Sequence, residues 1–203
     1  MSIRLSEKPN FIVEIANGYS GKLLREIIKI EEDSFESSFH YDDMDSFFKE
    51  MLEDESNISL VLRSNGKAVG YLLGRPHNDV RLELIEDDPL IKEDNERYYI
   101  ETMEIMNGYR SRGGFTKLIF FFIRTAQKRN INKYSAHARV TNGLFHVIKK
   151  LFSKDITLAR DIPAWKHGNN EPYKYIEITL RQSLLFLKFR LLLHKIIRSL
   201  SIR

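Results

Sequence analysis

A short loop in the middle of the chain combines basic residues with glycines in a pattern suited to anion binding. It covers residues 108–115, Gly-Tyr-Arg-Ser-Arg-Gly-Gly-Phe, between a predicted strand and a predicted helix. The first amides of a helix have no partners within the helix, and its dipole places positive charge at the same point. Gly113 and Gly114 let a phosphate approach the main chain, and Arg110 and Arg112 add charge-assisted contacts. On spacing alone, a plain strand-to-helix turn explains the glycines equally well.

The elements that position this loop follow from hydrophobic periodicity. The pattern predicts strands at 11–15, 58–63, 68–74, 97–106, 133–138, 156–159 and 173–180, with 81–85 as a further strand candidate. It predicts helices at 22–35, 115–129 and 142–152. A further helix is predicted to begin at a cap, Asp42, and to end near residue 55. The Asn65-Gly66 dipeptide predicts a tight hairpin between the second and third strands.

This order of elements predicts an α+β fold, in which helices flank both faces of a mixed central sheet. The chain has 203 residues, a length that predicts one domain with an appendage. We place the domain at residues 1–180 and the appendage at 181–203.

The run 99–118 resembles the core of the Gcn5-related N-acetyltransferases, the GNAT superfamily. The signature of that family is Gln/Arg-x-x-Gly-x-Gly/Ala after the fourth strand. Arg110 and Gly113 match it, while Phe115 stands at the final Gly/Ala position. Asn142 begins the next predicted helix, where family members often place an Asn near coenzyme A. In element order the resemblance covers about residues 11–180.

The resemblance implies a splayed sheet that holds acetyl-CoA as co-substrate. Pantetheine would run alongside the fourth strand at Met103 and Ile105, and Asn142 would lie near the coenzyme. The pyrophosphate would rest on the loop and helix start, at Arg110, Arg112, Gly113, Gly114, Phe115 and Thr116. Phe115 keeps its own N–H, so phosphate binding survives if its ring turns into the sheet.

Acyl transfer requires a neutral amine, and a carboxylate is the usual group that removes the proton. Family members often carry a base on the fourth strand, where this chain has Glu101 and Glu104. An offset of three residues predicts that they project from opposite faces, so that at most one points at the acceptor. We favour Glu101 because it lies farther from the phosphate loop, although either can be an ordinary solvated carboxylate.

The family often protonates the leaving thiolate with a Tyr about seven residues after the Asn, and here that position is Lys149. Lys149 can supply a proton or a positive charge, but not the geometry of a phenol. Tyr134, Tyr109 or Tyr173 can substitute, and so can water.

Composition excludes other chemistries. The chain has no Cys, which removes disulfides, thiolate metal sites and cysteine nucleophiles. The histidines show no metal-ligand spacing, so we predict no metal. The formal charge of +4 comes from the last residues, which carry six basic and no acidic side chains from Arg181 onward. Nucleic-acid binding is therefore not predicted, and a cytoplasmic location is the default.

Residues 183–201 have the pattern of an amphipathic helix with a basic polar face. Charge interrupts it too often for it to span a bilayer. It either docks on its own domain or a second subunit, or lies on an anionic membrane surface.

These observations predict an acetyl-CoA-dependent N-acetyltransferase that acetylates a primary amine of a small molecule or protein by direct attack. The acidic stretch 86–96 favours a cationic acceptor. The alternative is a noncatalytic acyl-CoA-binding or membrane-recruited regulatory module that kept the fold, as Lys149 and Phe115 suggest.

Overall fold

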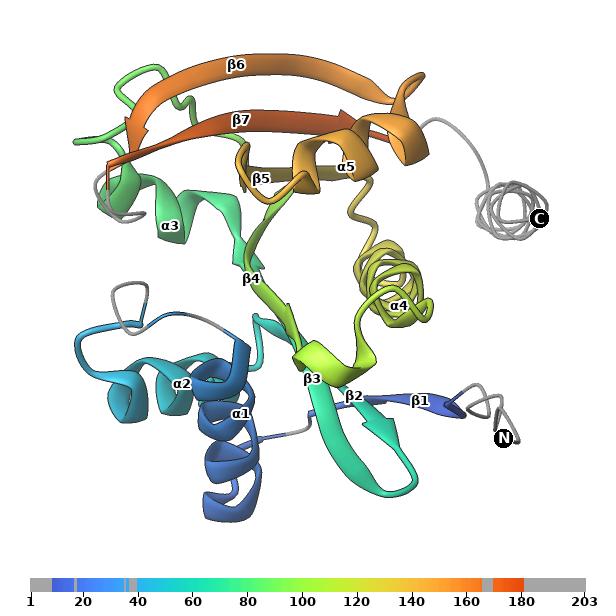
Figure 1. Ribbon diagram of the computed structural model, residues 1–203. Coiled ribbons are helices and arrows are strands. Elements are labelled where there is room, and N and C mark those ends of the chain that lie inside the picture. Colours follow the sequence, from blue (N-terminus) through green and yellow to red (C-terminus); the bar gives the residue numbers. More distant parts are fainter. Residues whose placement is uncertain (1–8, 17, 35, 37–39, 166–169, 181–203) are drawn as a thin grey trace, which may run out of the picture.

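The chain folds around a central β-sheet (Figure 1). The computed structural model describes residues 9–16, 18–34, 36, 40–165 and 170–180. In these residues the strands are β1 (Phe11–Ile15), β2 (Ile58–Ser64), β3 (Lys67–Pro76), β4 (Arg97–Ile105), β5 (Lys133–Arg139), β6 (Ile156–Trp165) and β7 (Glu171–Thr179). Their spatial order is β1-β2-β3-β4-β5-β7-β6. Neighbouring strands are antiparallel except β4 and β5, which are parallel. The predicted α+β class with a mixed sheet is confirmed.

Helices cover both faces of this sheet (Figure 1). The described helices are α1 (Gly21–Ser34), α2 (Met44–Glu53), α3 (His77–Leu84), the short 3-10 turn η2 (Asn107–Tyr109), α4 (Gly114–Gln127) and α5 (Leu144–Phe152). α4 packs on β1 to β4 and α5 on β5, while α1 contacts β3, β4 and α2, and α3 contacts β3 and β4. We call the side of α1, α2 and α3 the acidic face, because of the carboxylates described below.

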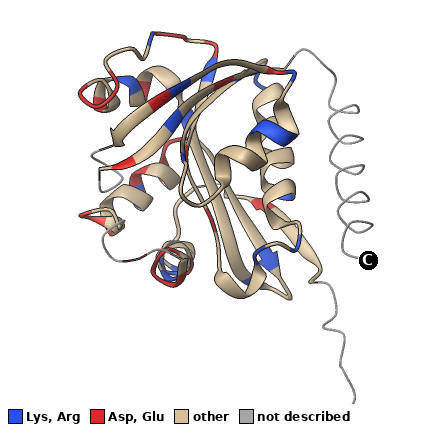
Figure 2. Ribbon diagram, turned by 45° about the horizontal axis from the view of Figure 1, so that its top comes forward, with Lys and Arg blue, Asp and Glu red and all other residues tan. Residues whose placement is uncertain are grey.

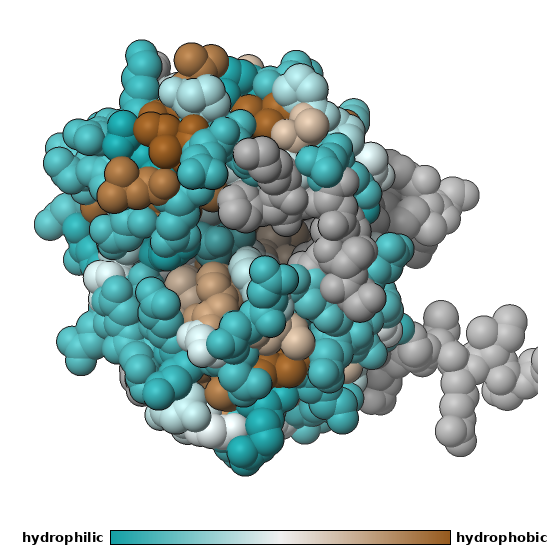
Figure 3. All heavy atoms as spheres, turned by 90° about the vertical axis from the view of Figure 1, so that its left-hand side faces the viewer, coloured by the Kyte–Doolittle hydropathy of each residue, from teal (hydrophilic) through white to brown (hydrophobic). Residues whose placement is uncertain are grey.

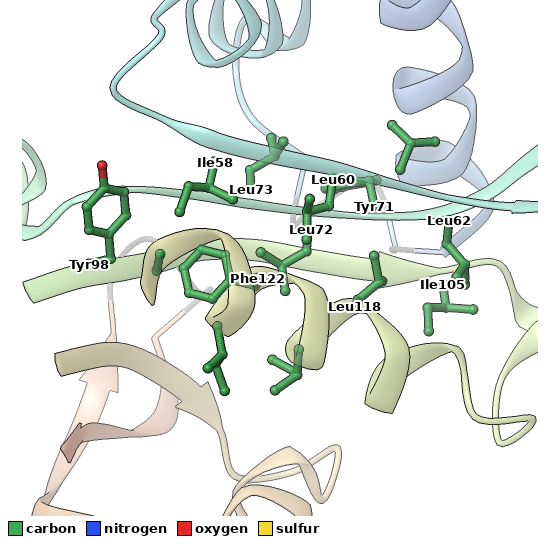
Figure 4. Packing of buried hydrophobic residues seen from close by; sticks show 14 of the residues in the cluster. Ile58, Leu60, Leu62, Tyr71, Leu72, Leu73, Tyr98, Ile105, Leu118 and Phe122 are labelled. Atoms are coloured by element: carbon green, nitrogen blue, oxygen red, sulfur yellow. The ribbon is translucent and has the colours of Figure 1, made fainter. Parts of the chain in front are cut away.

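The main core lies between the sheet and α4, and apolar side chains at helical spacing build it. Leu118 and Phe122 of α4 are fully buried and point at the strands, where Leu72 lies (Figure 4). A Cβ at Gly74 would lie 2.5 Å from Phe122 Cε2, so only glycine lets this ring approach β3 so closely. α4 is thereby fixed against the sheet, and its N-terminus with it.

Two local predictions are wrong. The strand candidate at 81–85 lies mostly in α3, because the buried residues His77, Val80 and Leu84 recur at helical spacing. The cap of α2 is Asp43, whose Oδ1 accepts the Ser46 amide at 3.0 Å, and not Asp42. The predicted C-terminal helix lies outside the described residues, so its docking or membrane role stays a prediction.

Candidate active site

The sheet opens between β4 and β5. Their parallel ladder joins only Arg97–Tyr99 of β4 to Lys133–Ser135 of β5, and the rest of β4 pairs with β3 alone. Figure 1 shows the two strands diverging beyond this short contact. A small apolar cavity of about 30 Å³ lies at this opening, lined by Ile100 of β4 and by side chains of α4, α5, β5 and β7. The opening places β4 where a second molecule can lie alongside it.

The N-terminus of α4 lies just beyond the end of β4 and carries free backbone donors. Its cap is Gly113, in the left-handed conformation at φ 93°, and no side chain of the described residues caps the helix. The first intrahelical bond runs from the Lys117 amide to the Gly113 carbonyl at 3.2 Å. The amides of Gly114, Phe115 and Thr116 therefore precede the intrahelical bonds and are directed at one point, as anion binding requires.

The other residues of this loop have distinct positions. Gly114 is buried, and a Cβ there would lie 2.6 Å from Leu62 Cδ2, so this glycine serves helix-to-sheet packing. The ring of Phe115 packs against the main core, which leaves its amide available. Arg112 is exposed beside the helix start. Arg110 instead folds back over β4, where its Nε donates to the Ile105 carbonyl at 2.9 Å.

Three further predicted coenzyme contacts lie around the same opening. Met103 is half-buried and packs against the main core, and Ile105 at the end of β4 is buried. Asn142 is exposed, and its Oδ1 accepts the Leu144 amide at 3.0 Å at the start of α5. The residues predicted to hold coenzyme A therefore come from β4, the α4 loop and the start of α5, three segments next to the opening.

Glu101 and Glu104 both project from the acidic face, because β4 carries a bulge between them. The pairing register with β3 shifts between Leu73 and Gly74, which leaves Glu101 as the extra residue. The bulge reverses the side-chain alternation once. The prediction that an offset of three residues separates the two carboxylates is therefore wrong.

Glu101 lies within an ion-pair chain. Arg75 on β3 donates from Nε to Glu101 Oε2 at 3.0 Å, and its other nitrogens bond both carboxylate oxygens of Glu83 on α3. The Glu101 side chain is 12% exposed and the Arg75 side chain 10%. Protonating Glu101 would leave the buried guanidinium with less compensating charge.

Glu104 has a different environment. Its partner is Arg110, at 3.0 Å, whose side chain is 46% exposed, while the Glu104 side chain is 13% exposed. Burial raises the pKa of Glu104 to about 7 against the opposing influence of Arg110. A carboxylate that titrates near neutral pH is suited to accept a proton from an amine.

A second buried carboxylate lies opposite Glu104 on α1. Glu31 has no exposed surface, and Tyr71 on β3 donates its hydroxyl proton to Glu31 Oε2. Burial raises the pKa of Glu31 to about 7 against this hydrogen bond, and the charge of Glu104 adds to the rise. Figure 2 shows red segments along α1 and α2, on the acidic face.

Comparison with known proteins decides the family. The model of the Acetyltransferase (GNAT) family matches residues 24–145, more than half of the chain. The chain belongs to this family. No curated protein matches the sequence of this GNAT protein.

Solved structures share its fold at low identity. The ribosomal-protein-S18-alanine N-acetyltransferase from Escherichia coli has a TM-score of 0.58 and 13% identity, covering 85% of this chain and 96% of its own. NAA60 from Arabidopsis thaliana, in complex with acetyl-CoA, has a TM-score of 0.60 and 16% identity, covering 84% of this chain and 97% of its own. An aminoglycoside 6'-N-acetyltransferase complexed with coenzyme A has a TM-score of 0.59 and 10% identity, covering 85% and 99%.

The structure does not bring the predicted proton donors of this GNAT protein together. Tyr134 is buried against Phe122 on the α4 side, and its hydroxyl donates to the Ile131 carbonyl at 2.9 Å. Lys149 is exposed on α5. Tyr109 packs near Phe11, and Tyr173 beside Trp165. The source of the thiolate proton stays a prediction.

Sequence reasoning missed Glu31, although the chain carries a signal for it. Glu31 follows Leu24 and Ile27 by seven and four residues, so it falls on the apolar stripe of the predicted helix. A charged residue on such a stripe is rarely buried without a reason. Tyr71 had no comparable signal, because a tyrosine in a strand is ordinary core.

Within the described residues, no group of three or more His, Cys, Asp or Glu side chains is arranged to hold a metal ion. The described part of the chain also holds no helix with the length and apolar character needed to cross a membrane.

Proposed function

We propose that this GNAT protein transfers the acetyl group of acetyl-CoA to a primary amine by direct attack within a ternary complex. The observation that carries the proposal is the geometry at β4. An uncapped helix N-terminus follows the strand at the opening of the sheet, and two carboxylates project from its acidic face.

The residues at the opening fit the coenzyme. The amides of Gly114, Phe115 and Thr116 would bind the pyrophosphate, and the exposed Arg112 would add charge. Met103 and Ile105 would lie along the pantetheine, and Asn142 near it. When bound, acetyl-CoA supplies an activated acetyl thioester. Two structures of the same fold, described as complexes with acetyl-CoA and coenzyme A, support this assignment.

Glu104 would act as the base. The acceptor's ammonium gives one proton to the Glu104 carboxylate, and the neutral nitrogen then forms a C–N bond to the acetyl carbon as the C–S bond breaks. The nitrogen loses its second proton as the amide forms, and the departing thiolate takes up one proton, which balances the step. Glu104 is preferred over Glu101 because its pKa of about 7 lies near the working pH, while Glu101 is tied to Arg75.

Release of free thiol from acetyl-CoA over a panel of primary amines tests the reaction, with mass spectrometry of the acetylated products. We expect thiol release that depends on the amine. Binding of coenzyme A without turnover on any amine would favour the alternative, a noncatalytic acyl-CoA-binding module.

A matched pair of variants tests the phosphate site. Gly113→Asp places a carboxylate where the phosphate would lie, and Gly113→Asn places a neutral side chain of nearly the same shape at the same left-handed position. We expect coenzyme A to raise the melting temperature of Gly113→Asn more than that of Gly113→Asp. Equal shifts in the two variants would reject this site.

A further inference from the structure

α1 buries a carboxylate that the proposed acetyl transfer does not use. Glu31 is fully buried, with one oxygen bonded to Tyr71. Its other oxygen, Oε1, has no hydrogen-bond partner among the residues that the structure describes. A buried carboxylate oxygen without a donor costs free energy, and glutamine would accept the Tyr71 hydrogen bond equally well. The position therefore holds a carboxyl group whose hydrogen-bonding capacity is only partly used by the described residues.

Glu31 and Glu104 face the same space. Tyr71 lies directly opposite Glu104 in the β3–β4 ladder, and opposite residues of antiparallel strands project from the same face. Arg110 forms an ion pair with Glu104, and Glu31 has no ion pair among the described residues. Arg110 is thus the one ion-paired cation of the two carboxylates among the described residues, while Arg139 acts on Glu104 through its charge alone. A further cation between the carboxylates would let both ionise.

Exposure rises from Glu31 through Glu104 to Arg110. The Glu31 residue is 0% exposed, the Glu104 side chain 13% and the Arg110 side chain 46%. Ser34 lies one turn after Glu31 on α1, and within the described part of the chain its buried Oγ also has no hydrogen-bond partner. Its carbonyl accepts from Arg110 at 3.0 Å, which places Ser34 beside the same cluster. Figure 3 shows a face of the molecule that is hollowed across its middle.

We propose that Glu31 and Glu104 form the binding site for the ammonium group of a cationic acceptor, and that Glu31 determines its specificity. This proposal rests on the proposed function and names its substrate class, a primary amine without a nearby anionic group. An ammonium has three donors in a compact head, which suits the free oxygens of Glu31 and Ser34 together with Glu104. A carboxylate near the amine would be repelled by Glu31 and Glu104, of which only Glu104 has an ion-pair partner among the described residues.

The acidic stretch 86–96 does not supply this preference. Asp88 pairs with Arg160, and Asp94 with Arg97 and Lys133. Its negative charge is largely used within the fold, whereas that of Glu31 is not.

The experiment compares two acceptors of similar length, 1,5-diaminopentane and 5-aminopentanoate, in the wild type, in Glu31→Gln and in Glu32→Gln. Glu32 is the matched control, since it is the next residue of α1 and is exposed. We expect the wild type to prefer the diamine at least about tenfold in kcat/KM. Glu31→Gln should raise the KM for the diamine about tenfold to a hundredfold, the size of a charge-assisted hydrogen bond. The KM for acetyl-CoA should not change, and Glu32→Gln should behave as the wild type.

Two results would overturn the ammonium site alone. One is a wild type that acetylates both amines equally well, which is measured without any variant. The other is a folded Glu31→Gln protein with an unchanged KM for the diamine. Absence of thiol release with every amine would instead overturn the proposed function, and this proposal with it.

Discussion

Two polar clusters are buried on the same face of the sheet, and they differ in how completely their groups are satisfied. We call the first the Asp88 cluster, made of Asp88, His137, Tyr99 and Arg160. The second is the Glu31 pair, made of Glu31 and Glu104. Both place carboxylates next to β4, so burial alone does not distinguish them.

Every charge of the Asp88 cluster has a partner. Arg160 bonds both oxygens of Asp88, and His137 Nε2 lies 3.2 Å from Asp88 Oδ2. The Tyr99 hydroxyl lies 2.9 Å from His137 Nδ1. Burial acts to raise the pKa of Asp88, but hydrogen bonds from His137 and Arg160 outweigh it and lower that pKa to about 2. This cluster ties the loop after α3 to β4, β5 and β6.

The Glu31 pair has the opposite electrostatics. Burial raises the pKa of both carboxylates to about 7, and no described residue donates a hydrogen bond to Glu31 Oε1. A protein gains stability from a complete cluster, whereas an incomplete one costs stability and persists where a ligand completes it. The difference predicts that one cluster serves the fold and the other serves the reaction.

The largest effect is expected at Glu104. Glu104→Gln fills the same space and still accepts from Arg110, but it cannot take the amine's proton. Turnover should fall about 100-fold to 10,000-fold, while the melting temperature and its shift with coenzyme A stay near those of the wild type. Steady-state kinetics and thermal unfolding on the same preparation measure both quantities.

Glu101→Gln is the matched control, because it makes the same change on the same face of the same strand. If Glu101→Gln loses turnover and Glu104→Gln does not, the base is Glu101, as the sequence favoured.

The contrast between the clusters also explains what the sequence could predict. The strands, most helices and the α4 loop follow from local patterns, since Gly113 and Arg110 are neighbours in the chain. The same-face position of Glu101 and Glu104 could not be predicted, because the bulge depends on the register with β3. α3 was missed because a histidine, His77, occupies one of its three buried positions.

The two clusters also differ in how far the sequence could predict them. Glu31 interrupts an apolar stripe, so its burial leaves a trace in the sequence. The Asp88 cluster joins residues from a loop and three strands, and no periodicity connects positions 88, 99, 137 and 160.

A smaller loss, of stability and not of turnover, is expected at Asp88. Asp88→Asn leaves the partly buried Arg160 without its counter-charge, which should cost about 3 kcal/mol of unfolding free energy. Turnover per folded molecule should change only a few-fold, since the cluster does not contact the reacting atoms. Denaturant unfolding at neutral pH measures the loss, with the exposed Glu86→Gln as control. A stable but inactive Asp88→Asn protein would place the Asp88 cluster in the active site.

The smallest expected effect is a gain of stability, and it concerns Glu31. The groups that face the Glu31 pair are Tyr71 on β3, Tyr41 before α2, Arg110, and Arg139 on β5. The folded pKa of Glu31 is about 7, above its ordinary value of 4.5. A carboxyl with a raised pKa costs nothing below pH 4.5, where it is protonated in both states, and costs the full penalty above pH 7.

Glu31→Gln should therefore be about 1 to 2 kcal/mol more stable than the wild type at pH 8.5 and equally stable at pH 4.5. The full difference between the folded and ordinary pKa values of Glu31 corresponds to about 3 kcal/mol. We expect a smaller gain, because Glu31 shares a proton with Glu104 and because the amide of the Gln variant must also be buried. His77 and His137 are present in both proteins, so their titration cancels when the two stabilities are compared at the same pH. Denaturant unfolding at the two pH values measures the difference. A Glu31→Gln protein that is less stable than the wild type at pH 8.5 would show that the carboxylate serves the fold, as Asp88 does, and would remove the contrast between the clusters.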